Sequence, residues 1–287
     1  MKELKIFGVI VFFTLFTYWG VEPYAHSIFH PHVEPADFEF TDLPKVEATG
    51  DVANGKAQVE MNCVACHGIE SEGINAPLDN QTANMSYGVV PPDLSLAGKI
   101  YNANFLANFI KNPEVATKTA HKFSEAGKVH PMPGYAWMSD SDIASIVAYL
   151  QDVANRKVEK DGLTDKEVFE NACGRCHNMK YAKIEATSDV SNYMGSTPPD
   201  LSVMIISRGH HYLETFINDP QKHLHGTAMP RVGLTEEAQA QVIAYMEATG
   251  DSKKEEREAL APLVLGFLAI MAVLSYFWKK EVWDEVK

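Results

Sequence analysis

The four cysteines of this 287-residue chain form two pairs, and each pair is followed at once by a histidine. The first group is Cys63-Val-Ala-Cys66-His67 and the second is Cys173-Gly-Arg-Cys176-His177. No cysteine is left over for a disulfide. Two thiols and an adjacent imidazole at C-x-x-C-H spacing are typical of covalent attachment of haem c, in which the histidine coordinates the iron. The sequence therefore predicts two covalently bound haem c groups.

Zinc is the main alternative, because paired cysteines also bind zinc. A zinc ribbon usually brings its pairs within a few tens of residues, whereas the two pairs here are over a hundred residues apart. Zinc would also leave both histidines unexplained. A thioredoxin-like disulfide would require a flanking βαβ pattern, which the sequence lacks. Haem remains the better explanation.

A Met-Pro pair follows each of the two histidines at a similar distance along the chain. Its methionine is a candidate for the sixth ligand of the haem iron. Met132 lies 65 residues after His67, and Met229 lies 52 residues after His177. A methionine thioether raises the potential of a haem and closes its iron to substrates. We predict His67/Met132 and His177/Met229 ligation, which favours an electron carrier over a dihaem peroxidase with an open iron. The competing ligands are His121, His130 and Met138 in the first half and Met204, His210, His211, His223 and His225 in the second.

The segment that carries these groups is a tandem repeat. Each copy has a short helical pattern, the C-x-x-C-H group, the letters Pro-Pro-Asp-Leu-Ser, a helix that ends before a proline, and Met-Pro before a last helix. These landmarks lie at residues 51–61, 63–67, 91–95, 109–113 and 132–133, and again at 163–171, 173–177, 198–202, 216–220 and 229–230. The last helices of the two copies are expected to begin at Ser139 and Thr235. Thr164 and Glu167 are expected to form a capping box.

Two apolar runs flank the repeat. Ile6–Val21 is 16 uncharged residues and Ala259–Trp278 is 20, the latter long enough to cross a bilayer core. The alternative for the first run is a cleaved secretory signal, but no A-x-A-like site follows it. We expect an uncleaved anchor at each end.

Lysines stand at the outer end of each run: Lys2 and Lys5 before the first, Lys279 and Lys280 after the second. The positive-inside rule then puts both termini in the cytoplasm and the repeat on the periplasmic side of the cytoplasmic (inner) membrane. The segment Ser252–Glu258 is expected to continue helically into the second anchor.

A histidine-rich segment joins the first anchor to the repeat. His26, His30 and His32 lie among prolines without helical periodicity, so we expect an extended linker. Three neighbouring histidines can form a metal site, but a polar strip at the headgroups or a partner surface is the better expectation.

The overall composition limits the partners. The chain has a formal net charge of -13 and a mean hydropathy of -0.17. Nucleic acid requires basic surfaces, so it is excluded as a partner. An acidic surface fits a basic or neutral protein partner instead.

At this point each half resembles a small monohaem cytochrome c domain of the mitochondrial type, which is all-α. In that family a Pro-x-Leu follows C-x-x-C-H: the proline carbonyl accepts a hydrogen bond from the proximal histidine, and the leucine packs on the haem. Pro92 and Leu94 match in the first half, and Pro199 and Leu201 in the second.

The whole chain resembles the dihaem variety of cytochrome c1, the haem c subunit of quinol–cytochrome c reductase (the bc1-type complex), including its VEPYAH segment. That resemblance implies cytochrome b and a Rieske iron–sulfur protein as partners and a soluble cytochrome c as acceptor. The alternatives are the dihaem subunit of a cbb-type haem–copper oxidase, which normally lacks a helix after its second haem domain, and the cytochrome subunit of a periplasmic dehydrogenase.

The resulting organisation is an all-α chain of two tandem cytochrome c domains between two transmembrane helices. The predicted boundaries are 1–23 for the N-terminal signal anchor, 24–48 for the linker, 49–156 and 157–252 for the two domains, and 253–287 for the C-terminal anchor with its cytoplasmic tail.

Overall fold

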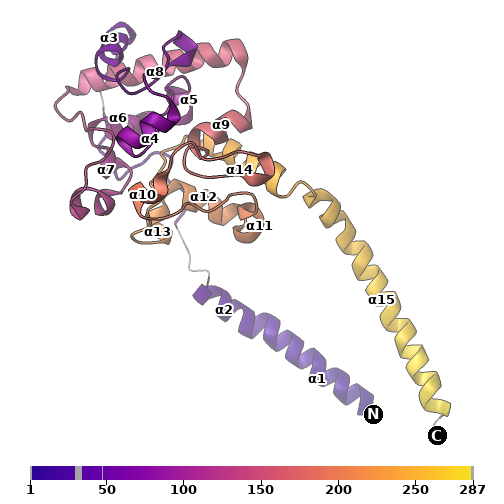
Figure 1. Cartoon of the computed structure of the whole chain (residues 1–287). Helices are drawn as coiled ribbons and strands as arrows, with labels where there is room; N and C mark the ends of the chain where they lie inside the picture. Colours follow the sequence, from indigo (N-terminus) through magenta and orange to yellow (C-terminus); the bar gives the residue numbers. More distant parts are fainter. Residues whose placement is uncertain (1, 30–33, 47, 286–287) are drawn as a thin grey trace.

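Two long helices project from a pair of packed helical domains in the computed structural model of the chain (Figure 1). The structure describes residues 2–29, 34–46 and 48–285. Every regular element in these ranges is helical, and strand-like pairing is limited to isolated bridges. The predicted all-α class is confirmed.

The N-terminal helix is longer than predicted. It runs through α1 (Lys2–Phe16), the π-helical turn η1 (Thr17–Val21) and α2 (Glu22–Phe29). Proline has no N–H for an α-helical hydrogen bond. Before Pro23 the hydrogen bonding changes from α-helical to π-helical, and the Glu22 N–H donates to the Thr17 carbonyl. The linker expected from residue 24 therefore begins with helix as far as Phe29, and His30 and His32 lie outside the described residues.

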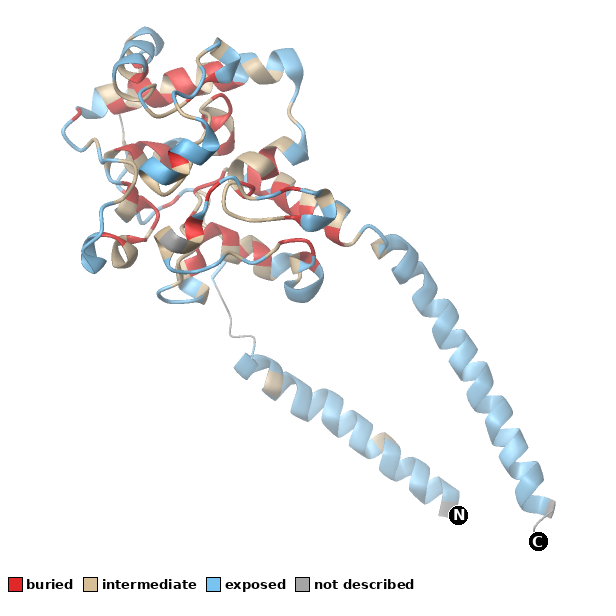
Figure 2. Cartoon of the chain, viewed as in Figure 1, coloured by how far each residue is buried: buried red, intermediate tan, exposed pale blue. Residues whose placement is uncertain are grey.

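The C-terminal helix α15 (Lys254–Glu285) begins within the segment predicted to continue into the anchor. Both terminal helices are candidate membrane spans by length and apolarity, with mean hydropathies of 1.8 and 2.3 in their most apolar windows. Both are exposed along their lengths, as Figure 2 shows in pale blue. Such apolar surfaces are stable in lipid rather than in water.

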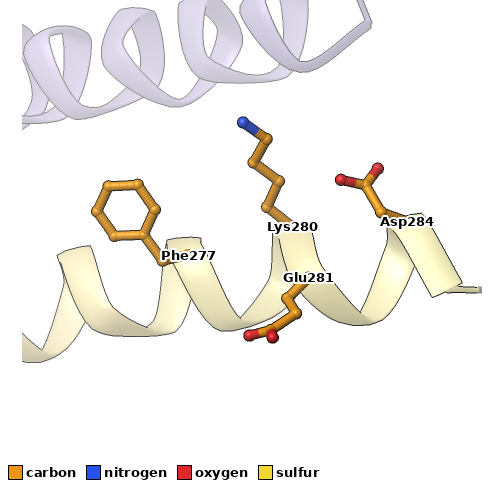
Figure 3. A pocket seen from close by; sticks show the side chains of 4 residues that line it. All are labelled: Phe277, Lys280, Glu281 and Asp284. Carbon is orange, nitrogen blue, oxygen red and sulfur yellow. The ribbon is translucent and has the colours of Figure 1, made fainter.

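The ends of the two helices approach each other far from the domains. Lys279 Nζ lies 3.0 Å from Glu3 Oε1, which joins α15 to α1. Lys280, the next residue, extends toward the neighbouring helix, and Glu281 points away from it (Figure 3). Both chain termini are thus at the same end of the molecule (Figure 1).

The first domain contains the following elements in order: α3 (Val52–Asn62), η2 (Glu70–Glu72), α4 (Asn80–Tyr87), α5 (Ala97–Ile100), α6 (Ala103–Lys111), α7 (Pro113–Ala116), η3 (Ala120–Lys122), η4 (Ser124–Ala126) and α8 (Asp140–Asp161). The second domain contains α9 (Asp165–Ala172), η5 (Lys180–Ala182), α10 (Val190–Met194), α11 (Met204–Arg208), α12 (His210–Asn218), α13 (Pro220–His223) and α14 (Glu236–Gly250). Apart from η3 and η4, each element of the first domain has a counterpart in the second. The predicted repeat is a structural duplication.

Side-chain caps begin the helices where the sequence predicts them. The Ser139 hydroxyl accepts from Asp142 N–H at α8, and Thr235 caps α14 in the same way. Thr164 and Glu167 form the predicted capping box at α9. These caps satisfy N–H groups that a helix leaves without intrahelical partners.

The boundary predicted between residues 156 and 157 falls inside α8, which continues to Asp161. The helix ends at Gly162, which has a φ of 77°. Glycine adopts this conformation readily, whereas other residues are strained in it. Leu163 and the capping box of α9 follow directly. The helix thus ends at this glycine, five residues after the predicted start of the second domain, and the domain boundary itself stays a prediction.

The two domains have separate apolar cores that adjoin at the domain junction, where Tyr101 packs against both. The first core is built around α3, α6 and α8, with Val59, Ile143 and Val153 fully buried. The second core, around α9, α12 and α14, also takes in two residues of the first domain, Leu96 directly before α5 and Ile100 at its end. The two domains therefore pack as one unit.

Residues 34–46, which we call the strap, cross both domains instead of hanging free. Phe40 and Leu43 are buried against Phe105 and Ala116 of the first domain. Asp37 N–H donates to the Asn218 side chain of the second domain at 2.9 Å. The strap fixes the pair of domains to the chain that leads to the first anchor.

Candidate haem-binding sites

Each C-x-x-C-H group forms a tight turn at the end of a helix. Cys63 follows α3, and its carbonyl accepts from both Cys66 N–H (3.0 Å) and His67 N–H (2.9 Å). The second group repeats this turn after α9, with the same two distances from the Cys173 carbonyl. In each copy the two thiols and the imidazole are thus carried by one backbone turn.

The histidine of each group is oriented by the proline that the family resemblance implies. His67 Nδ1 lies 2.7 Å from the Pro92 carbonyl oxygen, and His177 Nδ1 lies 2.9 Å from that of Pro199. A carbonyl oxygen only accepts, so Nδ1 carries the proton and donates it. Nε2 is then left with a lone pair for a metal, and the hydrogen bond increases its basicity.

The proline loops are fixed by equivalent contacts in the two copies. Leu94 N–H donates to the Gly68 carbonyl at 2.9 Å, and Leu201 N–H donates to that of Asn178 at the same distance. The carboxylate of the aspartate between the proline and the leucine accepts two backbone hydrogen bonds. Asp93 accepts from the N–H groups of Glu70 and Ser95. Asp200 accepts from those of Lys180 and Ser202. Both copies therefore place the Pro-x-Leu loop against the C-x-x-C-H turn.

Burial keeps the ligand groups neutral. It raises the pKa of the Cys63 thiol to about 11 and that of Cys173 to about 12, with the neighbouring cysteine adding to each rise. It also lowers the pKa of His67 and His177, against the opposing hydrogen bonds to the proline carbonyls. None of the four cysteines forms a disulfide, so each pair can form thioether bonds, and neutral imidazole is the form that binds a metal.

The predicted methionine ligands are both half-buried. Met132 packs against the first core, and its N–H donates to His130 Nδ1 at 3.1 Å. Met229 N–H donates to the Thr227 hydroxyl at 3.3 Å. Their ligation to iron stays a prediction.

Several competing ligands have other contacts. Met138 is buried in the first core, with 6% of its surface exposed. His121 Nε2 lies 3.1 Å from the Thr227 carbonyl, and His223 Nε2 lies 2.9 Å from the Thr215 hydroxyl. His210, His211 and His225 are exposed. These contacts favour the two methionines of the Met-Pro pairs.

The donor set fits haem better than a protein-only metal site. Within the described ranges, no group of three or more His, Cys, Asp or Glu side chains is placed to hold a metal ion. A haem needs only one histidine per copy from this set, together with two free thiols. The buried Arg175 Nε and Arg231 Nη2 also have no hydrogen-bond partner in the described chain, as expected where an acidic group such as a haem propionate would supply one.

The domain junction brings segments of the two sites into contact. The sequence analysis did not predict these contacts. Asn84 of α4 bonds the second domain twice: Nδ2 donates to the Thr187 carbonyl at 2.9 Å and Oδ1 accepts from Asp189 N–H at 3.0 Å. Arg175 Nη2 donates to the Val90 carbonyl at 3.0 Å. The only signal in the sequence is a charged residue between Cys173 and Cys176, where the first copy has alanine.

Comparison with known proteins gives two matches. The Cytochrome c family profile matches residues 52–154 and 166–250, which is more than half of the chain. No curated protein matches the chain. A solved structure described as "Hyperthermophilic respiratory Complex III" is similar at 18% identity, with a TM-score of 0.32, and the match covers 100% of this chain and 98% of that one.

Proposed function

This chain belongs to the cytochrome c family, and from that premise we propose that it is a membrane-anchored dihaem electron carrier of a respiratory chain. One observation carries the proposal: in both copies, the histidine of C-x-x-C-H donates Nδ1–H to a proline carbonyl and keeps Nε2 for a metal. The duplication of this arrangement supports one haem c in each domain.

The residues that would hold each haem are the same in kind. Cys63 and Cys66 would form the thioethers of the first haem, with His67 and Met132 as iron ligands. Cys173, Cys176, His177 and Met229 would hold the second haem in the same way. Haem iron, when bound, supplies a one-electron ferric–ferrous couple. Leu94 and Leu201 would pack on the haem faces and exclude water.

The arrangement of the anchors supports haem domains on the periplasmic side. Both chain termini are at the end farthest from the domains, beside the lysines of α1 and α15 (Figure 1). A membrane crossed by both helices would put the termini on one face and the domains on the other. The lysines beside the two spans favour a cytoplasmic location of both termini. Attachment of haem c requires export of the two domains to the other side.

A quinol-oxidising complex is the best-supported setting. The helix after the second domain, together with the resemblance to dihaem cytochrome c1, favours assembly with cytochrome b and a Rieske protein. An anchor fixes orientation and raises the effective concentration of a membrane-bound partner. One haem would accept electrons from the Rieske cluster, and the other would pass them to a soluble periplasmic cytochrome c, steered by the acidic surface.

Haem stoichiometry tests the first part of the proposal. The purified chain should stain for haem after denaturing electrophoresis, and pyridine haemochrome should give two haems per polypeptide. One haem, or stoichiometric zinc, would contradict it.

Affinity purification of the tagged chain in mild detergent tests the setting. We expect a b-type cytochrome and a Rieske subunit, with quinol–cytochrome c reductase activity. Copper-containing oxidase subunits would favour the cbb-type alternative, and a substrate-oxidising partner the dehydrogenase alternative. Reduction of the soluble acceptor should slow as salt screens the steering charges.

A further inference from the structure

The two domains differ in how far the loop after each candidate methionine ligand is covered. We call the segment between each Met-Pro pair and the last helix the post-methionine loop, which comprises residues 134–138 in the first domain and 231–234 in the second. In the second domain three of its four residues are buried, whereas in the first domain three of its five residues are exposed. The same part of the repeat is therefore closed in one copy and open in the other.

The post-methionine loop of the second copy is covered by the first domain. Arg231 N–H donates to the Thr117 carbonyl at 3.0 Å, and Leu234 forms an isolated β-bridge with Tyr101. Thr117 and Tyr101 both belong to the first domain, which matches the cytochrome c family. The chain thus contains one example of what packs on such a loop, and it is the surface of another cytochrome c domain.

Trp137 is the largest side chain of the open loop. It is 72% exposed, and its ring centroid lies 6.1 Å from that of Tyr135. It is also the only tryptophan between the terminal helices, which contain Trp19, Trp278 and Trp283. Exposed tryptophans are enriched among the residues that contribute most to protein–protein binding, because a rigid ring buries a large apolar area.

Tyr135 joins this loop to the first C-x-x-C-H group. Its hydroxyl donates to the Asn62 carbonyl at 3.0 Å, and Asn62 directly precedes Cys63. Met61, on the other side of Asn62, is 74% exposed. We call Met61, Tyr135 and Trp137 together the Trp137 surface. It adjoins the segment that would attach the first haem.

The Trp137 surface is open to a soluble partner. α3 ends at Asn62, and α8 begins three residues after Trp137. Both helices lie on the side of the domain pair that is turned away from the two anchors (Figure 1). A membrane crossed by the anchors would therefore not reach this surface.

The charges beside the Trp137 surface favour a basic partner. Three carboxylates flank it along the chain, those of Glu60, Asp140 and Asp142. Two lysines pair with them, Lys56 with Glu60 and Lys111 with Asp140. One negative charge is left at this surface, and the whole chain has a formal net charge of -13. An apolar centre with an acidic rim fits a protein that has an apolar patch within a basic surface.

We propose that the Trp137 surface docks the soluble electron acceptor, a basic cytochrome c domain, and that electrons leave the chain through the first haem. The inference rests on the proposed function. One electron passes from the ferrous first haem to the ferric haem of the acceptor, and no bond or proton changes place. The equivalent loop of the second domain is already covered, so the second haem is left to receive electrons from the membrane-bound donor.

Binding of mitochondrial cytochrome c, a basic soluble monohaem protein, to the full-length chain in detergent tests the surface. Surface plasmon resonance at low ionic strength gives the Kd with both proteins oxidised, so the readout does not depend on electron transfer. W137A should raise the Kd roughly tenfold or more, as expected for the central aromatic residue of an interface. W137F keeps an aromatic ring and should raise it less.

Y181A is the matched control. Tyr181 is an aromatic residue of the second domain and is 64% exposed. Its removal should leave the Kd unchanged. All three variants are first checked for two haems by pyridine haemochrome.

Stopped-flow oxidation of the reduced chain provides a second readout. The second-order rate constant with mitochondrial cytochrome c should fall in W137A by a factor similar to the rise in Kd. Ferricyanide, an oxidant too small to need a docking surface, should oxidise W137A and the unmodified chain at equal rates.

Four outcomes would overturn the proposal in chains that carry two haems. They are no binding of mitochondrial cytochrome c to the unmodified chain, an unchanged Kd in W137A, an equal rise in Y181A, or a change in the oligomeric state of W137A, which would assign the surface to a second copy. Slower reduction of the haems by quinol in W137A, with acceptor binding unchanged, would assign the surface to the donor and also overturn it. Fewer than two haems in the unmodified chain would instead contradict the proposed function.

Discussion

In the first domain the helix that follows Met132, α8, runs for 22 residues, whereas its counterpart α14 in the second domain runs for 15. The first domain also has its own core and the strap packed on its surface. The second domain borrows Leu96 and Ile100 from the first to complete its core. The duplicated domains are therefore unequal: the first supports itself and also supports the second.

The loop between Met229 and α14 shows the dependence most clearly. Asn102 N–H donates to the Gly233 carbonyl, and Thr235 N–H donates to the Ile100 carbonyl, both at 2.9 Å. Arg231 Nε, buried in the same loop, donates to the Ala116 carbonyl at 2.9 Å. The loop that offers the second methionine is held mainly by the first domain, so damage to the first domain should reach the second haem.

Removal of one haem at a time gives the largest expected contrast. In C63S/C66S the first haem cannot attach, and the second haem should lose its methionine–iron charge-transfer band because the first core no longer supports the Met229 loop. In C173S/C176S the remaining first haem should keep its band. Both variants should give one haem per chain by pyridine haemochrome, and absorption spectroscopy reads the bands. Equal behaviour of the two remaining haems would mean that the domains are independent.

Replacement of each methionine tests the ligands themselves. M132L and M229L should each remove the band of one haem and lower its midpoint on the order of 0.1–0.2 V, within the roughly 0.8 V over which axial ligands set haem potentials. The other haem should change little. A band that persists in either variant would place the ligand elsewhere, with His130 and Met204 as the first candidates.

The helix caps, which depend on local spacing, were predictable from the sequence. The caps of α8 and α9 follow from short motifs, whose residue types determine the backbone locally. The hydrogen bond from His67 to Pro92 was implied by the family resemblance. The all-α class was implied by the resemblance of each half to a cytochrome c domain.

The parts that depend on packing between distant segments were not predictable from the sequence. Arg175 and Val90 are 85 positions apart, and nothing in either segment indicates the contact. The strap was expected to be an extended linker because it has no periodicity, yet Phe40 is 1% exposed against the first domain. The helix through Pro23 was missed because a π turn, which the sequence does not signal, precedes the proline.

Substitution of Gly233 tests the junction between the two domains without changing a proposed iron ligand. The φ of Gly233 is 76°, and a Cβ there would lie 1.9 Å from Phe105 Cδ1 of the first domain. G233A should therefore combine backbone strain of about 1–2 kcal/mol with overpacking of about 1–3 kcal/mol, and loosen the second haem first. Thermal unfolding followed in the Soret region and the Met229 band measure this.

Gly226 is the matched control for that substitution. It has a similar φ of 75°, but nothing lies within 4 Å of a Cβ there. G226A should cost only the backbone strain and leave the band intact. If G226A and G233A destabilise equally, the contact with Phe105 contributes nothing and the asymmetry of the domains is weaker than the packing indicates.

The smallest expected effect is the acid sensitivity of the strap. Asp42 lies 2.7 and 2.8 Å from Arg231 Nη1 through its two oxygens, and Lys118 Nζ lies 3.2 Å away. Burial alone would raise the pKa of Asp42, but hydrogen bonding and the charges of Arg231 and Lys118 hold it below its ordinary value.

A lowered folded pKa fixes the sign of the pH dependence. The stabilisation from Asp42 is complete above the unfolded aspartate pKa of about 3.9 and is lost as the pH falls through the lower folded value. Because 43% of the Asp42 side chain is exposed, solvent screening should keep the contribution to about 1 kcal/mol or less. D42N should therefore lower the melting temperature slightly at pH 7 and flatten its fall below pH 4, whereas E39Q, an exposed change in the same strap, should alter neither. An unchanged acid limb in D42N would show that the ion pair with Arg231 does not hold the strap to the second domain.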